Sequence, residues 1–439
     1  MLIANIIGII ADDLTGANDT ALQFHANGCN TEILIDYKEA HKLRADIGAV
    51  AVSTESRNID PEVAANRTYE AALALKENFG VELFYKKIDS TLRGNVALEI
   101  LAALEAVEKD AAIIAPAFVQ EGRITIGGYQ LVKGIPIERT EAARDPHVPI
   151  YESSVPNILK RPLDEAQKEL VGLIEHAIVT KGAGPVTVKI NELVAAGKKL
   201  IVCDAVSLTD IEQVVMAIRK CSYDILPCGS AGLAQALAVG WVDADKTVQT
   251  INKKFPPLPK LVLSGSATQL SSLQIKKLQF DDEFENTYIL SLHLNDVLDG
   301  LNPAIVQRVA NNLAKNNIVV AHVGELEAEI EDEHSQSRER LIDEGISRDD
   351  LAHRITDYLA TLLSELKKVK EFILVTVGGE TSYKCAKALG AQNLQVVDSV
   401  LPSIPLCIDD NAQLIITKSG NLGTSTTLVE IMKYFSDHG

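Results

Sequence analysis

The stretch that most constrains the fold of this chain is residues 86–95, Lys-Lys-Ile-Asp-Ser-Thr-Leu-Arg-Gly-Asn. Residues 81–85 before it are apolar and aromatic enough to form a β-strand, and residues 96–104 after it repeat apolar side chains at helical spacing. An aspartate and two hydroxyls of the stretch are available to cap that helix. The pattern predicts a strand-to-helix junction in an α/β sheet, and such junctions are where α/β folds bind ligands.

This junction also concentrates charge. Lys86, Lys87 and Arg93 lie within a few residues of Asp89 and of the hydroxyl of Ser90. Cations beside a helix N-terminus suit an anion such as a carboxylate or a phosphate. The alternative is a capped helix whose surface cations extend into solvent, and this stretch alone is equally compatible with it.

Length and charge narrow the class of protein. At 439 residues the chain exceeds the size at which a single core stops growing, so two domains are expected. The formal net charge of −18 argues against nucleic-acid or anionic-membrane partners, because the overall field repels polyanions. An anionic small molecule would therefore need a local cationic pocket.

The cysteines and the N-terminus favour a cytoplasmic protein. The six cysteines are scattered, with no CxxC pair and no spacing typical of zinc ligands, which indicates free thiols in a reducing compartment. The apolar N-terminus lacks a basic region and runs directly into Asp12 and Asp13, which indicates a first strand rather than a signal peptide. No apolar run reaches the length of a membrane span.

The adjacent pair Asp12 and Asp13 is the second candidate for chemistry. Two carboxylates at the end of a strand repel one another and resist burial, so they are costly for packing alone. They suit a general base, a magnesium ligand or a partner for substrate hydroxyls, although one of them also suits the N-cap of the following helix. Arg57 follows another predicted strand, residues 47–53, where a guanidinium can clamp a carboxylate, but alone it is as readily a surface arginine.

The irregular stretch that follows Arg123 belongs to the same half of the chain. It holds residues 127–129 and 140–146 and is rich in Tyr, Arg and Asp. Long loops within compact domains are commonly functional, so we expect this stretch to face the substrate.

A proline-rich segment at residues 255–259 marks a stiff linker. We therefore predict a substrate-binding domain over residues 1–240, a linker over 241–260 and a second domain over 261–439. The fold class expected is α/β, with each domain a mostly parallel sheet flanked by helices and the active site in the interdomain cleft.

The second domain contains three turns of small residues, each at a predicted strand-to-helix junction. Each turn alone is a common connector, but together they could line one edge of one sheet and cradle a polyphosphate. Neither a P-loop nor a dinucleotide fingerprint is present, so any nucleotide would bind by another geometry. The candidate nucleotide-binding residues of these turns are Ser264, Gly265, Ser266, Gly378, Gly379, Glu380, Thr381, Lys418, Gly420 and Gly423.

These stretches resemble the motifs of the four-carbon acid sugar kinase family, whose members include D-threonate, D-erythronate and 3-oxo-tetronate kinases. The matching segments are residues 11–19, 56–57, 87–94, 378–381 and 417–420. They occur in the right order over almost the whole chain. The first and third of these segments are specific to the family, whereas the Gly-Gly-Glu-Thr turn is a common sequence.

The resemblance implies an N-terminal acid-sugar-binding domain and a C-terminal ATP-binding domain that transfers the γ-phosphoryl group to the C4 hydroxyl of a tetronate. By motif, Asp12, Arg57 and Lys87-Ile88-Asp89 would hold the substrate. Ser264, Gly378 to Thr381 and Gly420 would hold ATP.

Two departures from the family pattern lie in the nucleotide half. The usual Gly-Gly-Phe-Gly is Gly420-Asn421-Leu422-Gly423 here, and the usual Pro-Gly-Val-Pro is Pro402-Ser403-Ile404-Pro405. They leave the substrate motifs intact and put the geometry of the nucleotide loops in question.

The resulting hypothesis is an ATP-dependent kinase that uses Mg²⁺, with metal ligands that the sequence does not define. Asp12 and Asp13 are the catalytic candidates, and Arg57, Lys87 and Arg93 would clamp the substrate carboxylate. The full set of expected substrate-binding residues is Asp12, Arg57, Lys87, Ile88, Asp89, Ser90 and Arg93.

Two other functions fit parts of the same pattern. A non-catalytic regulator could bind an acid sugar or a nucleotide, but it would need no base, so the paired aspartates argue against it. A hydrolase or aldolase could act on a phosphorylated acid sugar, and ATP dependence separates it from a kinase. A homodimer is the expected assembly for an enzyme of this size.

Overall fold

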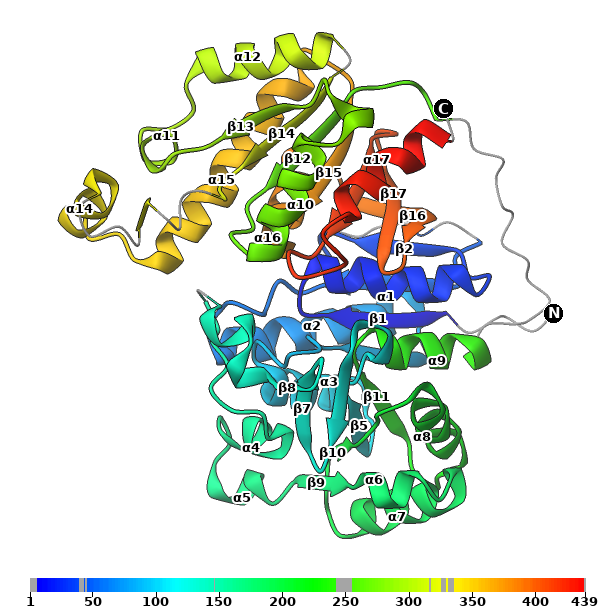
Figure 1. Ribbon diagram of the computed structural model, residues 1–439. Helices are drawn as coiled ribbons and strands as arrows, with labels where there is room; N and C mark the ends of the chain where they lie inside the picture. Colours follow the sequence, from blue (N-terminus) through cyan, green and yellow to red (C-terminus); the bar gives the residue numbers. More distant parts are fainter. Residues whose placement is uncertain are drawn as a thin grey trace. The chain divides into compact units, whose positions relative to one another are not determined.

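The computed structural model describes residues 6–38, 43, 46–145, 147–241, 255–315, 317–324, 329–330 and 335–437. The chain divides into two compact units, Met1–Val248 and Gln249–Gly439 (Figure 1). Both units are α/β, as the sequence predicts. Most of the predicted linker, residues 242–254, lies outside the described residues.

The first unit is built on a parallel sheet with the strand order β2-β3-β1-β4-β11-β5-β10-β9. Its strands read as apolar runs because both faces are covered by helices, and β5 is buried along its whole length. The strands are β1 Ile7–Ala11, β2 Thr31–Leu34, β3 Ala49–Ser53, β4 Leu83–Lys87, β5 Ala111–Ala115, β9 Val171–Ile174, β10 Leu200–Cys203 and β11 Ile225–Gly229.

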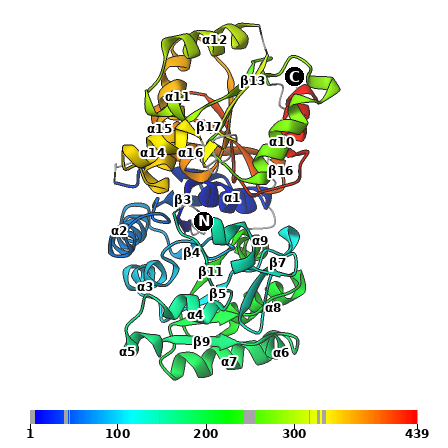
Figure 2. The same ribbon diagram turned by 60° about the vertical axis from the view of Figure 1, so that its left-hand side comes forward.

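Helices pack on both faces of this sheet. Helices α2, α3 and α4 share one hydrophobic core with the strands, while α7 and α8 share another, and α1 packs against α9 (Figure 2). The helices are α1 Leu14–Ala26, α2 Pro61–Phe79, α3 Val96–Val107, α4 Val155–Lys160, α5 Glu165–Lys168, α6 His176–Val179, α7 Ala183–Ala195, α8 Leu208–Lys220 and α9 Ala231–Trp241.

The stretch after Arg123 is more regular than the sequence indicates. It forms a small antiparallel sheet of β6 Arg123–Ile126, β7 Tyr129–Val132 and β8 Ile135–Pro136. Gly127 and Gly128 both have positive φ, at 59° and 76°, and make the tight β6–β7 turn.

The second unit has the strand order β13-β14-β12-β15-β18-β17-β16. The pairs from β13 to β18 are parallel, and β17 runs antiparallel to both β18 and β16. The strands are β12 Lys260–Ser264, β13 Tyr288–Ser291, β14 Ile318–His322, β15 Ile373–Val377, β16 Asn393–Leu401, β17 Ile404–Asp409 and β18 Leu414–Lys418.

Helices cover this second sheet as well. Helices α10 and α17 pack together on one side of the strands, and α15 and α16 pack together on the other (Figure 2). The helices are α10 Gln269–Gln279, α11 Leu294–Leu298, α12 Pro303–Ala314, α14 Gln336–Asp343, α15 Arg348–Lys367, α16 Gly379–Ala388 and α17 Thr427–Asp437.

Two other sequence expectations concern the whole chain. Within the ranges given above, no helix combines enough length with enough apolar character to cross a membrane. All six cysteines have free thiols, and five of them are buried, as expected.

The two lysines that end β4 serve different faces of the sheet, because successive strand residues point to opposite sides. Lys86 points toward α3, where its ammonium donates to Glu99 Oε2 at 2.8 Å. The Lys86 and Glu99 side chains are 0% and 1% exposed, so this ion pair lies in the core. Burial lowers the pKa of Lys86, but Glu99 and Asp12 outweigh it and raise the pKa above its ordinary value.

We expect Glu99→Ala to lower the free energy of unfolding by about 3–5 kcal/mol, because it leaves a buried ammonium without its counter-charge. The double variant Lys86→Met/Glu99→Leu should recover most of this loss, since it removes both charges. Urea denaturation of both variants measures the difference. Glu192→Gln, which breaks the exposed Lys189–Glu192 pair on α7, is the control and should change little. A double variant less stable than Glu99→Ala would contradict the prediction.

Candidate functional site

Three predicted motifs meet at one edge of the first sheet. Ala11 at the end of β1 pairs with Ser53 at the end of β3 and with Lys87 at the end of β4. Because these strands are parallel, the segments that follow them emerge side by side. The register therefore brings together Asp12, Arg57 and the turn that begins at Ile88.

Arg57 binds both aspartates of the pair. Its Nε and Nη2 donate to the two Asp12 carboxylate oxygens at 2.7 and 3.0 Å, and its Nη1 donates to Asp13 Oδ2 at 2.7 Å. Burial alone would raise the pKa of Asp12, but Arg57, with Lys87 and Lys86, holds it below its ordinary value. Asp12 is therefore ionised at neutral pH although it is buried.

The two aspartates have different roles in the fold. Asp13 is the N-cap of α1, where its carboxylate accepts from Gly16 N at 2.8 Å and from Thr15 Oγ1 at 2.7 Å. Among the described residues, Arg57 is the only hydrogen-bond partner of the Asp12 carboxylate. Asp12 thus has the greater free acceptor capacity of the two.

The turn that carries Arg57 is held from several sides. Ser56 N donates to Asp12 O at 3.0 Å, and Arg67 of α2 donates to the carbonyl of Glu55 at 3.0 Å. Asn95, the residue before α3, donates to Ser56 O at 3.0 Å. Neighbouring elements therefore fix the position of the Arg57 guanidinium.

The turn after β4 is organised by a second arginine fork. Arg93 donates to Asp89 from Nε at 2.7 Å and from Nη2 at 3.1 Å, and its Nη1 donates to Asp145 at 2.8 Å. Burial would raise the pKa of Asp89, but Arg93 and Arg57 hold it well below its usual range. Arg93 is thus engaged by two carboxylates, and its predicted contact with a substrate stays a prediction.

The other two predicted residues of this turn, Ile88 and Ser90, are both buried. Ile88 is 1% exposed and belongs to the core, and its backbone N–H donates to Gly229 O at 2.9 Å. Ser90 is buried, and its hydroxyl accepts a hydrogen bond from Arg123.

Lys87 differs from the cations described so far. Its side chain is buried and points toward α1, where a Cβ atom at Gly16 would lie 2.8 Å from its Nζ. In the described part of the chain its ammonium makes no hydrogen bond and no ion pair. An ammonium at the end of a largely buried side chain, with no carboxylate paired to it, is well placed to bind an anion. Lys87 is therefore the cation most available to an anionic ligand.

The sequence pattern does not single out Glu55, which lies beside this cluster. Its backbone has φ 44°, a left-handed conformation that is unusual for glutamate, and its Oε1 accepts from Leu14 N at 2.9 Å and Ser53 Oγ at 2.5 Å. Burial and, to a smaller extent, Asp13 raise the pKa of Glu55 to about 8, despite Ser53 and Arg57. Glu55 is thus largely protonated at neutral pH and adds little negative charge.

In the second unit the three predicted turns lie side by side. Ser264 at the end of β12 pairs with Val377 at the end of β15, which pairs in turn with Lys418 at the end of β18. The turns after these parallel strands therefore occupy the same sheet edge, as the sequence suggests. Gly378 has φ 117°, a conformation that favours glycine.

The turns pack so closely that a side chain in place of Gly265 or Gly420 would clash with the neighbouring turn. A Cβ atom at Gly420 would lie 2.3 Å from Ser266 Oγ, and a Cβ atom at Gly265 would lie 2.4 Å from Thr381 Oγ1. Ser271 Oγ, which donates to Gly420 O at 3.1 Å, ties the first turn to the third. Gly265, Gly378 and Gly420 remain partly exposed at this sheet edge.

Polar side chains of these turns divide into engaged and free groups. Lys418 is 0% exposed and donates to Ser419 O at 2.7 Å, so it holds its own turn, and its predicted contact with phosphate stays a prediction. Glu380 bonds His353 at 2.5 Å and Thr356 at 3.0 Å. Ser264 Oγ, by contrast, is buried and has no hydrogen-bond partner within the described residues.

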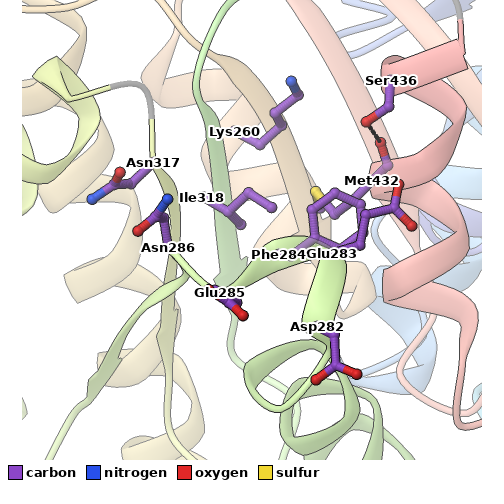
Figure 3. A pocket seen from close by; sticks show the side chains of 10 residues that line it. All are labelled: Lys260, Asp282, Glu283, Phe284, Glu285, Asn286, Asn317, Ile318, Met432 and Ser436. Carbon is purple, nitrogen blue, oxygen red and sulfur yellow. Dashed lines mark hydrogen bonds between the residues drawn. The ribbon is translucent and has the colours of Figure 1, made fainter.

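A pocket of the second unit lies at the opposite end of the strands. Lys260 is the first residue of β12 and Ile318 the first of β14, whereas the three turns follow the last residues of their strands. Figure 3 shows the residues that line this pocket: Lys260, Asp282, Glu283, Phe284, Glu285, Asn286, Asn317, Ile318, Met432 and Ser436. It is therefore separate from the three turns.

Comparison with known proteins identifies both units. Residues 7–237 match the family described as "Sugar-binding N-terminal domain", and residues 261–428 match "Nucleotide-binding C-terminal domain". A D-erythronate kinase of Heliobacterium modesticaldum is 31% identical over 91% of this chain and 89% of its own length. The chain belongs to the four-carbon acid sugar kinase family. It is a kinase, which sets aside the regulator and the hydrolase or aldolase.

Another relative and a solved structure agree with this assignment. A D-threonate kinase of Salmonella typhimurium is 29% identical to this acid sugar kinase over 98% of each chain. The crystal structure of a Haemophilus influenzae protein of the family designated DUF1537 is 25% identical and superposes with a TM-score of 0.68. That structure matches 98% of this chain and 100% of its own, so the likeness extends through both units.

The pKa of Glu55 makes the stability of this acid sugar kinase depend on pH. Folding raises this pKa from 4.5 to about 8, because the folded protein disfavours the ionised form of Glu55. The contribution of protonated Glu55 to the free energy of unfolding is therefore complete below pH 4.5 and is lost as the pH rises to about 8. We expect Glu55→Gln to lose less stability than the wild type between pH 5.5 and pH 8. Partial solvent exposure limits the difference to the order of 1–2 kcal/mol.

Chemical denaturation at the two pH values measures this effect. Glu77→Gln, on an exposed position of α2, is the matched control and should follow the wild type. Equal loss of stability with pH in the wild type and in Glu55→Gln would contradict the prediction.

Proposed function

We propose that this acid sugar kinase transfers the γ-phosphoryl group of ATP to the C4 hydroxyl of threonate, erythronate or 3-oxo-tetronate, giving the 4-phosphate. The observation that carries the proposal is the unpartnered Lys87 ammonium beside Asp12, a carboxylate that Arg57 keeps ionised. An anionic substrate that also carries hydroxyl groups satisfies both features. Relatives named D-threonate kinase and D-erythronate kinase support the same substrate class.

On the substrate side, Lys87 binds the carboxylate and Asp12 accepts the hydrogen bond of the attacking hydroxyl. Phosphoryl transfer depends mainly on positioning and charge neutralisation, and the hydroxyl proton is released late. An aspartate of low pKa is therefore a sufficient acceptor, provided that it stays ionised. Arg57 keeps it ionised and fixes its orientation through two hydrogen bonds.

On the nucleotide side, the three turns of the second unit fit a polyphosphate. Their close packing excludes side chains, and the buried Ser264 hydroxyl lacks a partner within the described residues. Backbone amides of Gly378 to Thr381 and of the Gly420 turn would bind phosphate oxygens at the start of α16 and beside β18. Bound ATP would supply the phosphoryl group, and Mg²⁺ would neutralise the charge of the phosphate oxygens.

This proposal keeps the functions that the sequence predicts for the two domains. Residues 1–240 bind the acid sugar, residues 261–439 bind ATP, and the reaction in the interdomain cleft stays a prediction of the sequence. Free thiols, which fit a reducing compartment, support the predicted cytoplasmic location.

A coupled ADP-release assay with Mg·ATP tests the proposal. The substrates are D-threonate, L-threonate, D-erythronate, L-erythronate and the 3-oxo-tetronates, and we expect turnover with at least one of them. Threonate and erythronate differ at one stereocentre, and a single hydroxyl contact can separate them strongly. No turnover across the panel, with ATP binding intact by calorimetry, would contradict a tetronate substrate.

We expect Asp12→Asn to lower turnover by about 100-fold or more, because it removes the acceptor of the hydroxyl proton. ATP binding by calorimetry should be unchanged, since the predicted nucleotide site belongs to the second unit. Asp13→Asn keeps a good N-cap residue and should lose less turnover. Loss of ATP binding in Asp12→Asn would contradict the domain assignment, and the reverse order of the two variants would contradict the role of Asp12.

A further inference from the structure

The small sheet β6-β7-β8 places Arg123 against the Ser90 turn. Thr125 N and O both bond Ala205, at 2.9 and 3.0 Å, which fixes β6 beside the end of β10. The buried Gln130 donates to Ser90 O at 2.8 Å and accepts from Thr125 Oγ1 at 2.6 Å. The sheet is therefore fixed to the turn that follows β4, and Arg123 is its first residue.

The contacts of Arg123 are few for a largely enclosed guanidinium. Its Nη1 donates to the Ser90 hydroxyl, and its Nε is buried without a hydrogen-bond partner. Across the residues that the structure describes, no carboxylate forms an ion pair with it. Burial lowers its pKa, and the nearby Arg93 adds to this, although Asp89 opposes it.

Arg57 and Arg93, the other two arginines of this substrate site, are bound differently from Arg123. The Arg57 fork is occupied by Asp12 and Asp13, and the Arg93 fork is occupied by Asp89 and Asp145. A planar guanidinium matches a carboxylate through two parallel hydrogen bonds, which a point charge such as lysine cannot reproduce. Of these three arginines, Arg123 is the one that has no carboxylate partner among the described residues.

We propose that Arg123 is a specificity-determining residue that receives the substrate carboxylate on its guanidinium, beside the Ser90 hydroxyl. This inference rests on the proposed function, because it assumes an acid-sugar ligand at this sheet edge. Lys87 contributes charge to the same carboxylate, and Arg123 adds the planar contact that fixes its orientation.

A ligand role and a structural role for Arg123 predict opposite effects on stability. An arginine that holds the fold would destabilise the protein when it is removed. An arginine that binds a ligand carries an unpaired charge in the free protein, and burying that charge lowers the free energy of unfolding. Its removal should therefore leave the melting temperature unchanged or raise it. Arg123→Gln removes the charge and keeps an N–H donor for Ser90.

The test uses the full-length wild type, Arg123→Gln, Arg123→Lys and the control Arg139→Gln, an exposed arginine of the same segment. Isothermal calorimetry measures the binding of D-threonate, D-erythronate and the neutral alcohols threitol and erythritol, which lack the carboxylate. The coupled assay gives KM and kcat for any acid that turns over, and thermal denaturation gives the melting temperature.

We expect Arg123→Gln to raise the Kd and KM of the acid by about 10- to 100-fold, with a smaller effect on kcat. Arg123→Lys should lie between this variant and the wild type, because it keeps the charge and loses the fork. Arg123→Gln should bind the neutral alcohols as the wild type does, and its melting temperature without ligand should be equal to or higher than that of the wild type. The control Arg139→Gln should match the wild type in all of these measurements.

Three outcomes would overturn the inference. The first is an unchanged KM in Arg123→Gln, which would leave the proposed kinase function intact. The second is a rise in KM accompanied by a lower melting temperature and an equal loss of alcohol binding, which would show a structural role. The third is a wild type that binds no acid of the panel, which would overturn the proposed function as well. Acid binding without ADP release would reject the proposed function alone, and calorimetry would still test Arg123.

Discussion

The candidate substrate site depends on the contact of Arg57 with Asp12 and Asp13. Two adjacent carboxylates at the end of a buried strand repel one another and need a counter-charge. Arg57 supplies it from the end of the neighbouring strand, and Arg67 and Asn95 hold the turn that carries it. The contact ties β1 to β3 and keeps Asp12 ionised. The chemistry proposed here follows from that state.

Around this contact, charged groups divide into those that build the site and those left for a ligand. Lys86 is bound by Glu99 inside the core, whereas Lys87, one residue further on, points to the other face and is unpartnered among the described residues. Arg93 is bound by two aspartates, whereas Arg123 has only the Ser90 hydroxyl there. The second unit uses backbone turns and buried hydroxyls at its sheet edge, which suits a polyphosphate that brings its own metal ion.

The local structure of the site could be predicted from the sequence, but its charge pairing could not. Strand β4, helix α3 and the three small-residue turns all follow from apolar periodicity and turn residues, which are local signals. The pairings of Arg57 with Asp12, and of Arg123 with Ser90, join residues 45 and 33 positions apart. Strand register and the β6-β7-β8 sheet decide them, so the pattern could not reveal the raised pKa of Glu55 or the open Arg123.

The most direct test of this account is the position of the phosphate in the product. Phosphorus NMR of the reaction with Mg·ATP and the acid that turns over separates the possible esters. An ester at C4 couples phosphorus to the two protons of a terminal CH₂ group and gives a triplet, which is the result expected here. A doublet would place the phosphate on a secondary hydroxyl, and free inorganic phosphate alone would mean hydrolysis. Either result would contradict an active site that holds the carboxylate at one end and presents the C4 hydroxyl to ATP at the other.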